Sequence, residues 1–487
     1  MKLSGTWLRG LAVLAALWAL WTLEGARLAV PERQIETTSG LVSLYGAGDG
    51  PLVIVAHGFA GSTRMMQSLS RDLARAGFRA AAFDFAGHGR SRALMSSDVT
   101  RIEGTTEQLV AQTVAITRAL RAELGWSGPV ALLGHSMATD IVIRAATELE
   151  DVAAVIAISM YSEAVTATSP ERLLILSGEW ETRLRAVALE AVRMVAPAAG
   201  EGQTVTAGPV TRRSAVAPNV EHVGVLYSTS TMKEARNWLS EALDVPTHGQ
   251  ARSEGRAILT LLISLIVLGS ALPKRLPKAR GTRPPLPLRD VLITAFVPVL
   301  PAMAAAWAFG GAVFGVAAFG HLLAFFLVWG VVALGLLLRA GHKPERPDPA
   351  GIIVLMAMCL VFALALDRYG AAFVPVGARA GIMAALMVGT VPFMLADQLL
   401  VDGAALWRRI VLRLLPIVAL LALMLWSPQP FGLLFTVLPV MVLFYAVFGT
   451  MGRMVAMRTG PGTSGIALGV VLAWSIAASQ PLFDAAM

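Results

Sequence analysis

Long apolar runs restrict the fold of this chain more than any other feature of its sequence. A helix needs about 17–25 mostly apolar residues to cross a bilayer, and runs near this length recur after residue 256, with another at Trp7–Leu23. Backbone polar groups must be paired within each run, which predicts helices. The spans predicted in the C-terminal half are Ala257–Leu272, Val291–Phe309, Phe314–Leu338, Gly351–Leu366, Gly381–Ala396, Ile410–Trp426, Phe431–Phe448 and Gly465–Leu482.

Composition supports a membrane protein. Hydrophobic residues make up 56% of the 487 residues and charged residues only 15%, which is too apolar for an ordinary soluble protein. The single cysteine, Cys359, excludes an intrachain disulfide and a cysteine-based zinc site, and we expect no metal and no cofactor. The net charge of +8 comes from Lys and Arg clustered between apolar runs. That pattern indicates membrane topology, so we expect no nucleic-acid partner.

Basic residues predict the orientation of the spans, because short cytoplasmic loops are rich in Lys and Arg. They lie at the start of the first span and after the second, fourth, sixth and eighth, whereas the alternate loops hold little beyond Arg368 and Arg379. This predicts a multi-pass cell (inner) membrane protein with a cytoplasmic N-terminus and with residues 31–250 on the extracytoplasmic, periplasmic side. The basic residues are Lys2, Arg9, Lys274, Arg275, Lys278, Arg280, Arg283, Arg289, Arg339, Lys343, Arg346, Arg408, Arg409, Arg453 and Arg458.

The first apolar run has two interpretations. Its basic start and short apolar core also fit a cleaved secretory signal. No clear small-x-small cleavage site follows, because residues 22–26 read Thr-Leu-Glu-Gly-Ala. We therefore favour an uncleaved anchor over residues 1–30. In either case the segment that follows is exported.

The segment between the first two spans alternates β-rich runs with helical stretches, as in a parallel sheet with crossover helices. This predicts an α/β domain over residues 31–245, a linker over 246–256 and a transmembrane domain of about eight helices over 257–487. Strands are predicted at Leu41–Tyr45, Leu52–Ala56, Phe78–Phe83, Pro129–Leu133, Val152–Ile158, Arg172–Ser177 and Thr211–Ala217. Helices are predicted at Ser62–Ala76, Thr105–Leu124, Ala138–Glu148, Thr182–Met194 and Met232–Leu243.

A serine lies between one of these strands and the next helix, in Gly134-His135-Ser136-Met137-Ala138. A serine on a tight strand-to-helix turn is exposed at the carboxyl edge of a parallel sheet, where it can act as a nucleophile. Small neighbours are needed because the turn brings the strand close to the helix. The alternative is a strand-to-helix turn with no chemistry.

Nucleophilic catalysis also needs a base, an acid that orients the base, and donors for the oxyanion. His222 is the best candidate base, because it follows the last predicted strand. Glu181, in Gly178-Glu179-Trp180-Glu181, is the preferred acid and Glu179 the alternative. Both glutamates also fit a purely structural role at the start of a helix.

The oxyanion donors are predicted from His57-Gly58-Phe59, at the end of another strand. Glycine lets the backbone turn so that a peptide N–H can point at the substrate oxygen. We assign the Phe59 and Met137 amides to this role, with a simple strand-ending turn as the alternative.

Together these motifs resemble the α/β-hydrolase superfamily, particularly its monoglyceride-lipase and lysophospholipase-like serine esterases. The resemblance covers about residues 40–245 and includes HGF at 57–59, DFAGHGRS at 84–91, GHSMA at 134–138, GEWE at 178–181 and EHVG at 221–224. It implies an α/β-hydrolase fold, a triad in the order Ser136, Glu181, His222, and a structural role for His88 in a loop near the site. Two departures, Ala138 for glycine and Glu181 for aspartate, leave room for altered activity.

Only about a dozen residues, Ser159–Pro170, separate two core strands where lipases of this family insert a lid. We therefore expect no lid insertion. An uncovered site would be wet, so the bilayer or the membrane domain is expected to supply the cover. Deleting residues 257–487 while keeping an anchor would test this expectation, and unchanged activity on lipid substrates would contradict it.

The sequence thus predicts a membrane-embedded serine hydrolase that cleaves esters of lipids or acylated envelope components through an acyl-enzyme on Ser136. An acyltransferase would share the first half-reaction. A transporter or a non-catalytic scaffold carrying a hydrolase-like domain is the alternative from another class. Coupled ion transport is disfavoured because the spans hold almost no ionisable groups beyond residues near their ends, such as His321 and Arg413.

Overall fold

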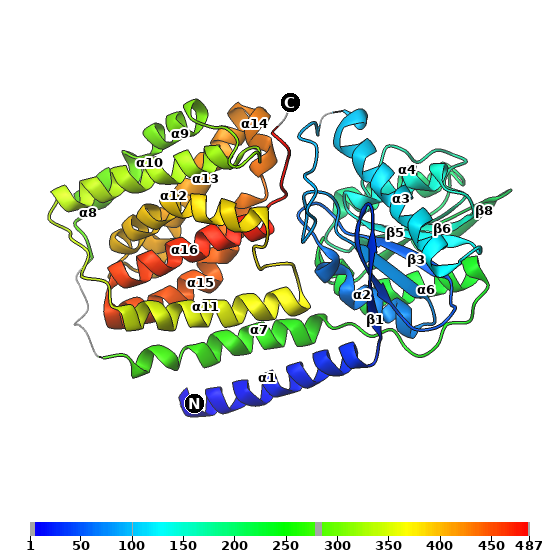
Figure 1. Ribbon diagram of the computed structural model, residues 1–487, viewed down its shortest axis with the longest axis horizontal. Coiled ribbons are helices and arrows are strands. Elements are labelled where there is room, and N and C mark those ends of the chain that lie inside the picture. The colour runs from blue at the N-terminus through cyan, green and yellow to red at the C-terminus, as the bar shows by residue number, and fades with distance from the viewer. Residues whose placement is uncertain (1–4, 100, 278–284, 486–487) are drawn as a thin grey trace. The chain divides into compact units, whose positions relative to one another are not determined.

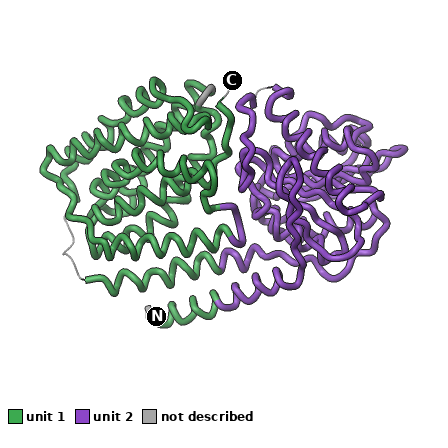
Figure 2. Tube along the Cα trace, viewed as in Figure 1, with its two compact units in different colours: residues 1–16, 261–367, 373–487 green, residues 17–260, 368–372 purple. Residues whose placement is uncertain are grey.

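The computed structural model describes residues 5–99, 101–277 and 285–485. Lys2, Lys278, Arg280 and Arg283, on which the predicted orientation partly rests, lie outside these residues. The chain forms two compact units, coloured separately in Figure 2. The sheet unit contains Leu17–Thr260 and Arg368–Ala372, and the helical unit contains Met1–Ala16, Leu261–Asp367 and Phe373–Met487.

A nine-stranded mixed sheet forms the centre of the described part of the sheet unit, in the order β1-β2-β4-β3-β5-β6-β7-β9-β8 (Figure 1). The six strands from β4 to β9 in this order run parallel, whereas β1, β2 and β8 pair antiparallel at the two edges. The strands are β1 Glu32–Thr37, β2 Gly40–Tyr45, β3 Leu52–Ala56, β4 Arg79–Phe83, β5 Val130–His135, β6 Val152–Ile158, β7 Arg172–Gly178, β8 Thr204–Ala207 and β9 Val210–Ala217.

The predicted α/β fold is confirmed, and the unpredicted strands are the two edge strands β1 and β8. Residues of β3, β4 and β5 are buried throughout, as expected for parallel strands covered on both faces. By contrast, β1 reads ERQIET and β8 reads TVTA, and most of their residues are exposed. Such polar edge strands protect a sheet from further pairing, but they lack the apolar pattern by which strands are recognised.

Four α-helices lie between successive strands of the sheet, and a fifth follows the last strand, β9. The four are α2 Thr63–Arg75, α3 Glu107–Leu124, α4 Ala138–Glu148 and α5 Thr182–Arg193, and the fifth is α6 Thr229–Leu243. Short turns of other helical types lie at η1 Ile102–Thr106 and η2 Gly224–Tyr227. Leu69 of α2 and Trp238 of α6 share one hydrophobic core with Val53 and Val55 of β3. Between β6 and β7, residues 159–171 contain no helix, in agreement with the predicted absence of a lid.

In the described residues, nine helices are long and apolar enough to cross a membrane. Each predicted span has a counterpart, although several boundaries shift. These candidate spans are Thr6–Leu28, Gly255–Arg275, Leu288–Ala308, Phe319–Arg339, Pro349–Tyr369, Ala378–Leu400, Leu406–Trp426, Gly432–Thr459 and Pro461–Ser479. The helices that form these spans are α1 Gly5–Leu28, α7 Gly255–Gly269, η3 Leu272–Arg275, α8 Leu288–Phe296, α9 Val299–Ala308, α10 Phe319–Arg339, α11 Pro349–Tyr369, α12 Ala378–Leu400, α13 Leu406–Trp426, η4 Gly432–Leu434, α15 Val437–Thr459 and α16 Pro461–Ser479. A short helix, α14 Pro428–Phe431, precedes η4.

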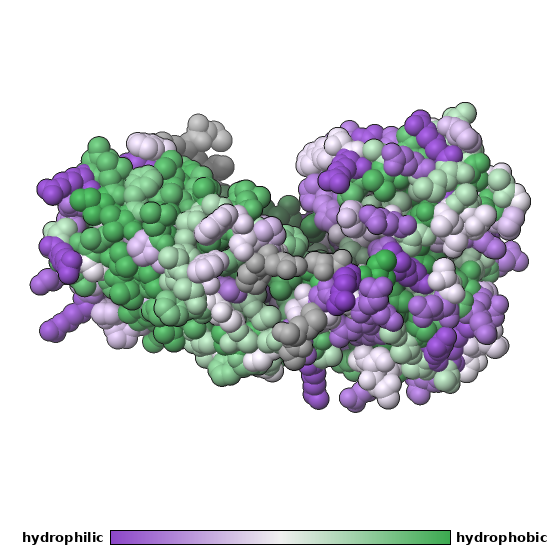
Figure 3. Space-filling model, turned by 90° about the horizontal axis from the view of Figure 1, so that it is seen from above, coloured by the Kyte–Doolittle hydropathy of each residue, from purple (hydrophilic) through white to green (hydrophobic). Residues whose placement is uncertain are grey.

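The surface of the helical unit suggests a membrane protein. Hydrophobic residues dominate its visible face in Figure 3, and Leu300, Leu425 and Trp426 are each about three-quarters exposed. Apolar surface on this scale is unusual for a protein surrounded by water. Proline occurs within several of these spans: Pro392 and Pro416 lie inside α12 and α13, and Pro298 separates α8 from α9.

Candidate active site

Ser136 stands on a sharp turn between β5 and α4. Its φ is +54°, a left-handed conformation that non-glycine residues rarely adopt. Its backbone N–H donates to the Ile158 carbonyl at 2.8 Å, which fixes the turn against β6. A Cβ on Gly134 would lie 2.5 Å from the Ala138 carbonyl oxygen, so the turn requires glycine there. Ala138 itself is fully buried at the start of α4.

The structure brings Ser136, His222 and Glu181 into one hydrogen-bonded chain. Ser136 Oγ lies 2.8 Å from His222 Nε2, and His222 Nδ1 lies 2.5 Å from Glu181 Oε1. The His222 side chain is 43% exposed and that of Glu181 only 5%. A substrate can therefore reach the serine and imidazole, while the carboxylate stays shielded behind them.

The other oxygen of Glu181, Oε2, accepts two more hydrogen bonds. The Gly178 backbone N–H donates at 2.6 Å and Ser159 Oγ–H at 2.8 Å. Burial acts to raise the pKa of Glu181, but the hydrogen bonds from His222, Gly178 and Ser159 together lower that pKa below its ordinary value. The carboxylate is thus held ionised and oriented toward the imidazole.

Glu179, the alternative acid, bonds to the backbone of the loop before His222. Its Oε2 accepts the Asn219 backbone N–H at 2.7 Å, and its neighbour Trp180 donates its N–H to the Val220 carbonyl at 3.2 Å. A Cβ on Gly178 would lie 2.6 Å from that same carbonyl oxygen. The GEWE segment therefore supplies both the carboxylate and the support for the loop that carries His222.

His135 holds the His222 loop from the other side. Its Nε2–H donates to the His222 backbone carbonyl at 2.9 Å, and the two rings lie 4.9 Å apart. Burial, followed by repulsion from His222, lowers the pKa of His135 to about 4. His135 is therefore neutral near pH 7 and acts as a hydrogen-bond donor. Sequence reasoning assigned no such role to it.

The predicted oxyanion turn lies directly beside Ser136, the predicted nucleophile. A Cβ on Gly58 would lie 2.9 Å from Ser136 Cβ, and Gly61 N–H donates to the Gly58 carbonyl at 2.9 Å. His57 accepts the Phe85 N–H on Nε2 at 3.1 Å, so its Nδ1–H donates to the Gly58 carbonyl at 2.8 Å. Burial lowers the pKa of His57. His57 thus shapes the turn, while the Phe59 and Met137 amides remain the predicted oxyanion donors.

The loop after β4 supports this turn without reaching the triad. Asp84 accepts the Thr63 N–H at 2.7 Å and the Arg90 N–H at 2.8 Å. His88 Nδ1–H donates to the Ala86 carbonyl at 2.9 Å, and its ring lies 5.2 Å from that of His57. These contacts fit the structural role implied for His88. Among the residues that the structure describes, no three His, Cys, Asp or Glu side chains converge on a possible metal position.

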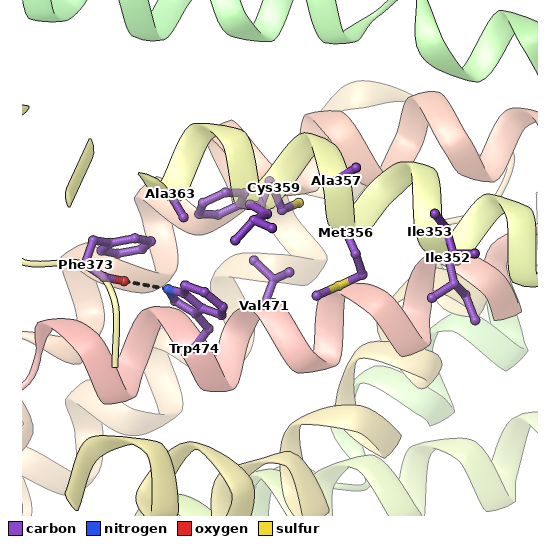
Figure 4. Close-up of a pocket in the computed structure, with 11 residues that line it drawn as sticks. Ile352, Ile353, Met356, Ala357, Cys359, Ala363, Phe373, Val471 and Trp474 are labelled. Carbon is purple, nitrogen blue, oxygen red and sulfur yellow. Dashed lines mark hydrogen bonds between the residues drawn. The ribbon is translucent and has the colours of Figure 1, made fainter. Parts of the chain in front are cut away.

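An apolar cavity of about 380 Å³ lies in the helical unit (Figure 4). Its wall includes Met356 and Cys359 of α11 and Trp474 of α16. The Trp474 Nε1–H donates to the Phe373 carbonyl at 2.6 Å, so the indole has no hydrogen bond to offer a ligand. Among the described residues that line the cavity, none is charged, and Cys359 supplies the one thiol.

Loss of the Ser159 hydroxyl is expected to change how the sheet unit responds to acid. Because the pKa of Glu181 is lowered, its ionised carboxylate stabilises the folded state above the ordinary carboxyl pKa, and this stabilisation disappears as the pH falls through the lowered pKa. Ser159→Ala should shift that loss to higher pH. Melting temperatures of the full chain, measured between about pH 6 and 3, test this.

Ser240→Ala on α6 is the control for this variant. The Ser240 hydroxyl donates to the Val245 backbone carbonyl at 2.7 Å and not to a carboxylate. Its acid transition should follow that of the wild type. Identical transitions for Ser159→Ala and the wild type would contradict the prediction.

Comparisons with known proteins agree with this architecture. Residues 51–191 match the family model described as alpha/beta hydrolase fold. No protein in the curated set matches the sequence. Among solved structures, the chain is similar to TT1662 from Thermus thermophilus (17% identity, 44% of this chain, 99% of that chain, TM-score 0.33), and to a thermophilic esterase from Thermogutta terrifontis (14%, 44%, 99%, 0.33).

A further similarity is to a soluble variant of monoglyceride lipase from Saccharomyces cerevisiae, with 13% identity, 44% of this chain, 96% of that chain and a TM-score of 0.33. At these TM-scores the similarities to single structures carry no argument about activity. The family match and the sheet topology identify the architecture. The N-terminal part of the chain therefore has the α/β-hydrolase fold, and a helical C-terminal region with several apolar helices follows it.

Proposed function

We propose that this protein is a membrane-embedded serine hydrolase that cleaves ester substrates through an acyl-enzyme on Ser136. The observation that carries the proposal is the unbroken chain from Ser136 Oγ through both nitrogens of His222 to Glu181, with contacts of 2.8 and 2.5 Å. Such a chain on a strained turn at the end of a parallel strand has the geometry of an activated nucleophile.

In the proposed mechanism, Ser136 Oγ attacks the acyl carbon while His222 Nε2 takes the hydroxyl proton. Glu181 stabilises the imidazolium that forms and keeps the ring in the required tautomer. The Phe59 and Met137 N–H groups stabilise the oxyanion, to which a single donor can contribute about 2.7–4 kcal/mol. His222 then protonates the leaving alcohol, and water attacks the acyl-enzyme with His222 as its base.

Lipids or acylated envelope components are the proposed substrates. Two observations support this. The His222 side chain is exposed and Ser136 is half-buried, and the same polypeptide contains helices apolar enough to cross a membrane. Residues 159–171, between β6 and β7, contain no helix. A site without a lid insertion on a membrane-anchored protein suits a substrate presented by the bilayer.

Hydrolysis by the purified full chain tests this proposal. Short nitrophenyl esters and monoacylglycerols should be cleaved by the wild type, and Ser136→Ala should lose this activity. Adding glycerol or an amine as acceptor distinguishes the acyltransferase alternative, which would yield the transferred acyl product in place of the free acid. A scaffold or a transporter with a non-catalytic domain would turn over none of these esters.

We also propose that the sheet unit lies on the extracytoplasmic side of the cell (inner) membrane, with the N-terminus in the cytoplasm. Single-cysteine variants in a Cys359→Ala background test this topology. Glu163→Cys, at an exposed position between β6 and β7, should react with a membrane-impermeant maleimide in spheroplasts. Lys343→Cys, at an exposed position between α10 and α11, should react only after permeabilisation. The reverse pattern would contradict the proposed orientation.

A further inference from the structure

Five residues, the last two of α11 and the three that follow it, belong to the sheet unit, about 110 residues beyond the rest of it in the chain. They are Arg368–Ala372, shown in the colour of the sheet unit in Figure 2. The Arg368 guanidinium forms a two-point ion pair with Glu24 of α1, with distances of 2.7 and 2.8 Å. Tyr369 donates its hydroxyl hydrogen to the same carboxylate. The segment is therefore fixed at its first residues by charged contacts.

The far end of this segment contacts Ser62, which immediately precedes α2. A serine at this position ordinarily accepts a hydrogen bond from its own helix, but Ser62 makes no such side-chain cap. Its Oγ instead accepts the Ala372 backbone N–H at 3.1 Å. Asp84 caps α2 instead, because its carboxylate accepts the Thr63 N–H at 2.7 Å. The buried Ser62 hydroxyl thus serves the distant segment and not its own helix.

Gln67, one turn farther along α2, makes the second contact. Its side chain is fully buried. Its Nε2–H donates to the Arg368 carbonyl at 3.2 Å, while its Oε1 accepts from Arg71 at 2.9 Å. A buried amide with both ends satisfied holds its partners in a single arrangement. Segment 368–372 is therefore attached to α2 at two points, one from each end.

Other segments of the sheet unit also attach to α2, near the points where the chain continues into the helical unit. Arg71 pairs with the buried Glu254 at 2.5 Å, and the Glu254 N–H donates to Ser68 Oγ at 3.0 Å, just before α7 begins. Arg75 reaches the Ala26 carbonyl at the end of α1, at 3.5 Å. The helix α2 thus receives contacts from three segments: residues 368–372, the residue before α7 and the end of α1.

The helix α2 begins directly after the turn that lies beside Ser136. Only four residues, Gly58–Gly61, separate the buried His57 from Ser62, and Gly58 lies against Ser136. Ala60 in this turn has a φ of +56°, which is strained for a residue with a side chain. Fixing the start of α2 therefore fixes the far end of a short, strained turn that contains Phe59.

We propose that Arg368–Ala372, acting through Ser62 and Gln67, positions the Phe59 N–H for the oxyanion. This inference rests on the proposed function, because it assigns a positioning role to residues far from the triad. It predicts that ester hydrolysis depends on a segment outside the contiguous α/β-hydrolase sequence. The affected quantity is stabilisation of the transition state, and not affinity for the ground state.

Ser62→Ala in the full chain tests the inference. We expect kcat for a short nitrophenyl ester to fall by about 5- to 50-fold with KM within about twofold, because loss of an oxyanion donor lowers kcat by about 10²–10³-fold and this variant only displaces one. Its matched control is Ser70→Ala on the same helix, whose buried hydroxyl donates only to the Met66 carbonyl, at 3.0 Å. This control should keep wild-type kcat.

Gln67→Glu is the second variant, for the case in which Ser62→Ala does not fold. It keeps an acceptor for Arg71 but removes the donor to the Arg368 carbonyl, and it should lower kcat in the same direction. Hydrogen–deuterium exchange over residues 57–66 gives a readout that does not need activity. Uptake there should rise in Ser62→Ala and Gln67→Glu and stay at the wild-type level in Ser70→Ala.

The outcomes separate this inference from the proposed function. If the wild type hydrolyses no ester but uptake rises only in the two test variants, the segment positions the turn and the proposed function is wrong. If the wild type is active and the test variants match Ser70→Ala in kcat, the inference is overturned. Equal uptake in all variants overturns it as well, whatever the activity.

Discussion

Replacement of His222 by glutamine is expected to lower kcat for ester hydrolysis by roughly 10⁴–10⁶-fold and to leave KM nearly unchanged. Glutamine can still bond to Ser136 or to Glu181, but it cannot take the hydroxyl proton. The residual rate would come from substrate binding and the oxyanion turn alone. Steady-state kinetics of the purified full chain on one chromogenic ester give both constants.

His248→Gln is the control for this variant. His248 is exposed in the segment before α7, where its backbone N–H donates to the Ala76 carbonyl at 3.3 Å, away from the triad. Its kcat should equal that of the wild type. A His222→Gln enzyme that retained more than about a tenth of wild-type kcat would exclude His222 as the general base, since removal of a proton acceptor costs at least 10²-fold.

Glu181→Gln is expected to lower kcat by about 10⁴-fold, the size of the loss when a triad carboxylate becomes an amide. The amide would donate to His222 Nδ1 and so favour the tautomer whose Nε2 already carries hydrogen. That tautomer cannot accept the proton of Ser136, although the three side chains would stay in place. The same kinetic assay measures the loss.

Glu179→Gln provides the matched comparison, two residues away. Its amide oxygen can still accept the Asn219 N–H, the contact that Glu179 makes at 2.7 Å. We expect kcat to change by less than about tenfold, as for loss of one charge-assisted bond. Equal losses in the two variants would show that neither carboxylate acts specifically on the imidazole.

The sequence was sufficient to predict the parallel sheet and its central strands, because strands buried on both faces are continuous apolar runs bounded by turns. It also predicted the stretches that contain Ser136, His222 and Glu181, since each stands at the end of a strand. The edge strands β1 and β8 were missed because their exposed residues lack an apolar pattern. The end of one predicted span was placed too early, because α15 continues through Gly449 and Gly452 to Thr459.

The supporting residues could not be predicted from local patterns. A single serine after a strand gives no signal that it donates to Glu181 from 22 residues away, as Ser159 does. His135 belongs to the nucleophile motif, but its bond to the His222 carbonyl appears only when the two loops meet in space. The contact between Ser62 and Ala372 joins positions 310 residues apart. Such contacts depend on tertiary structure, which composition and periodicity do not encode.

Covalent labelling of the full chain with a fluorophosphonate, followed by mass analysis of the modified peptide, tests the central claim most directly. The reagent forms a stable bond only with a serine whose proton is removed by a base. We predict one adduct, on the peptide that contains Ser136, and its loss in Ser136→Ala and in His222→Gln. An adduct on another serine, or an unlabelled wild type, would contradict the account.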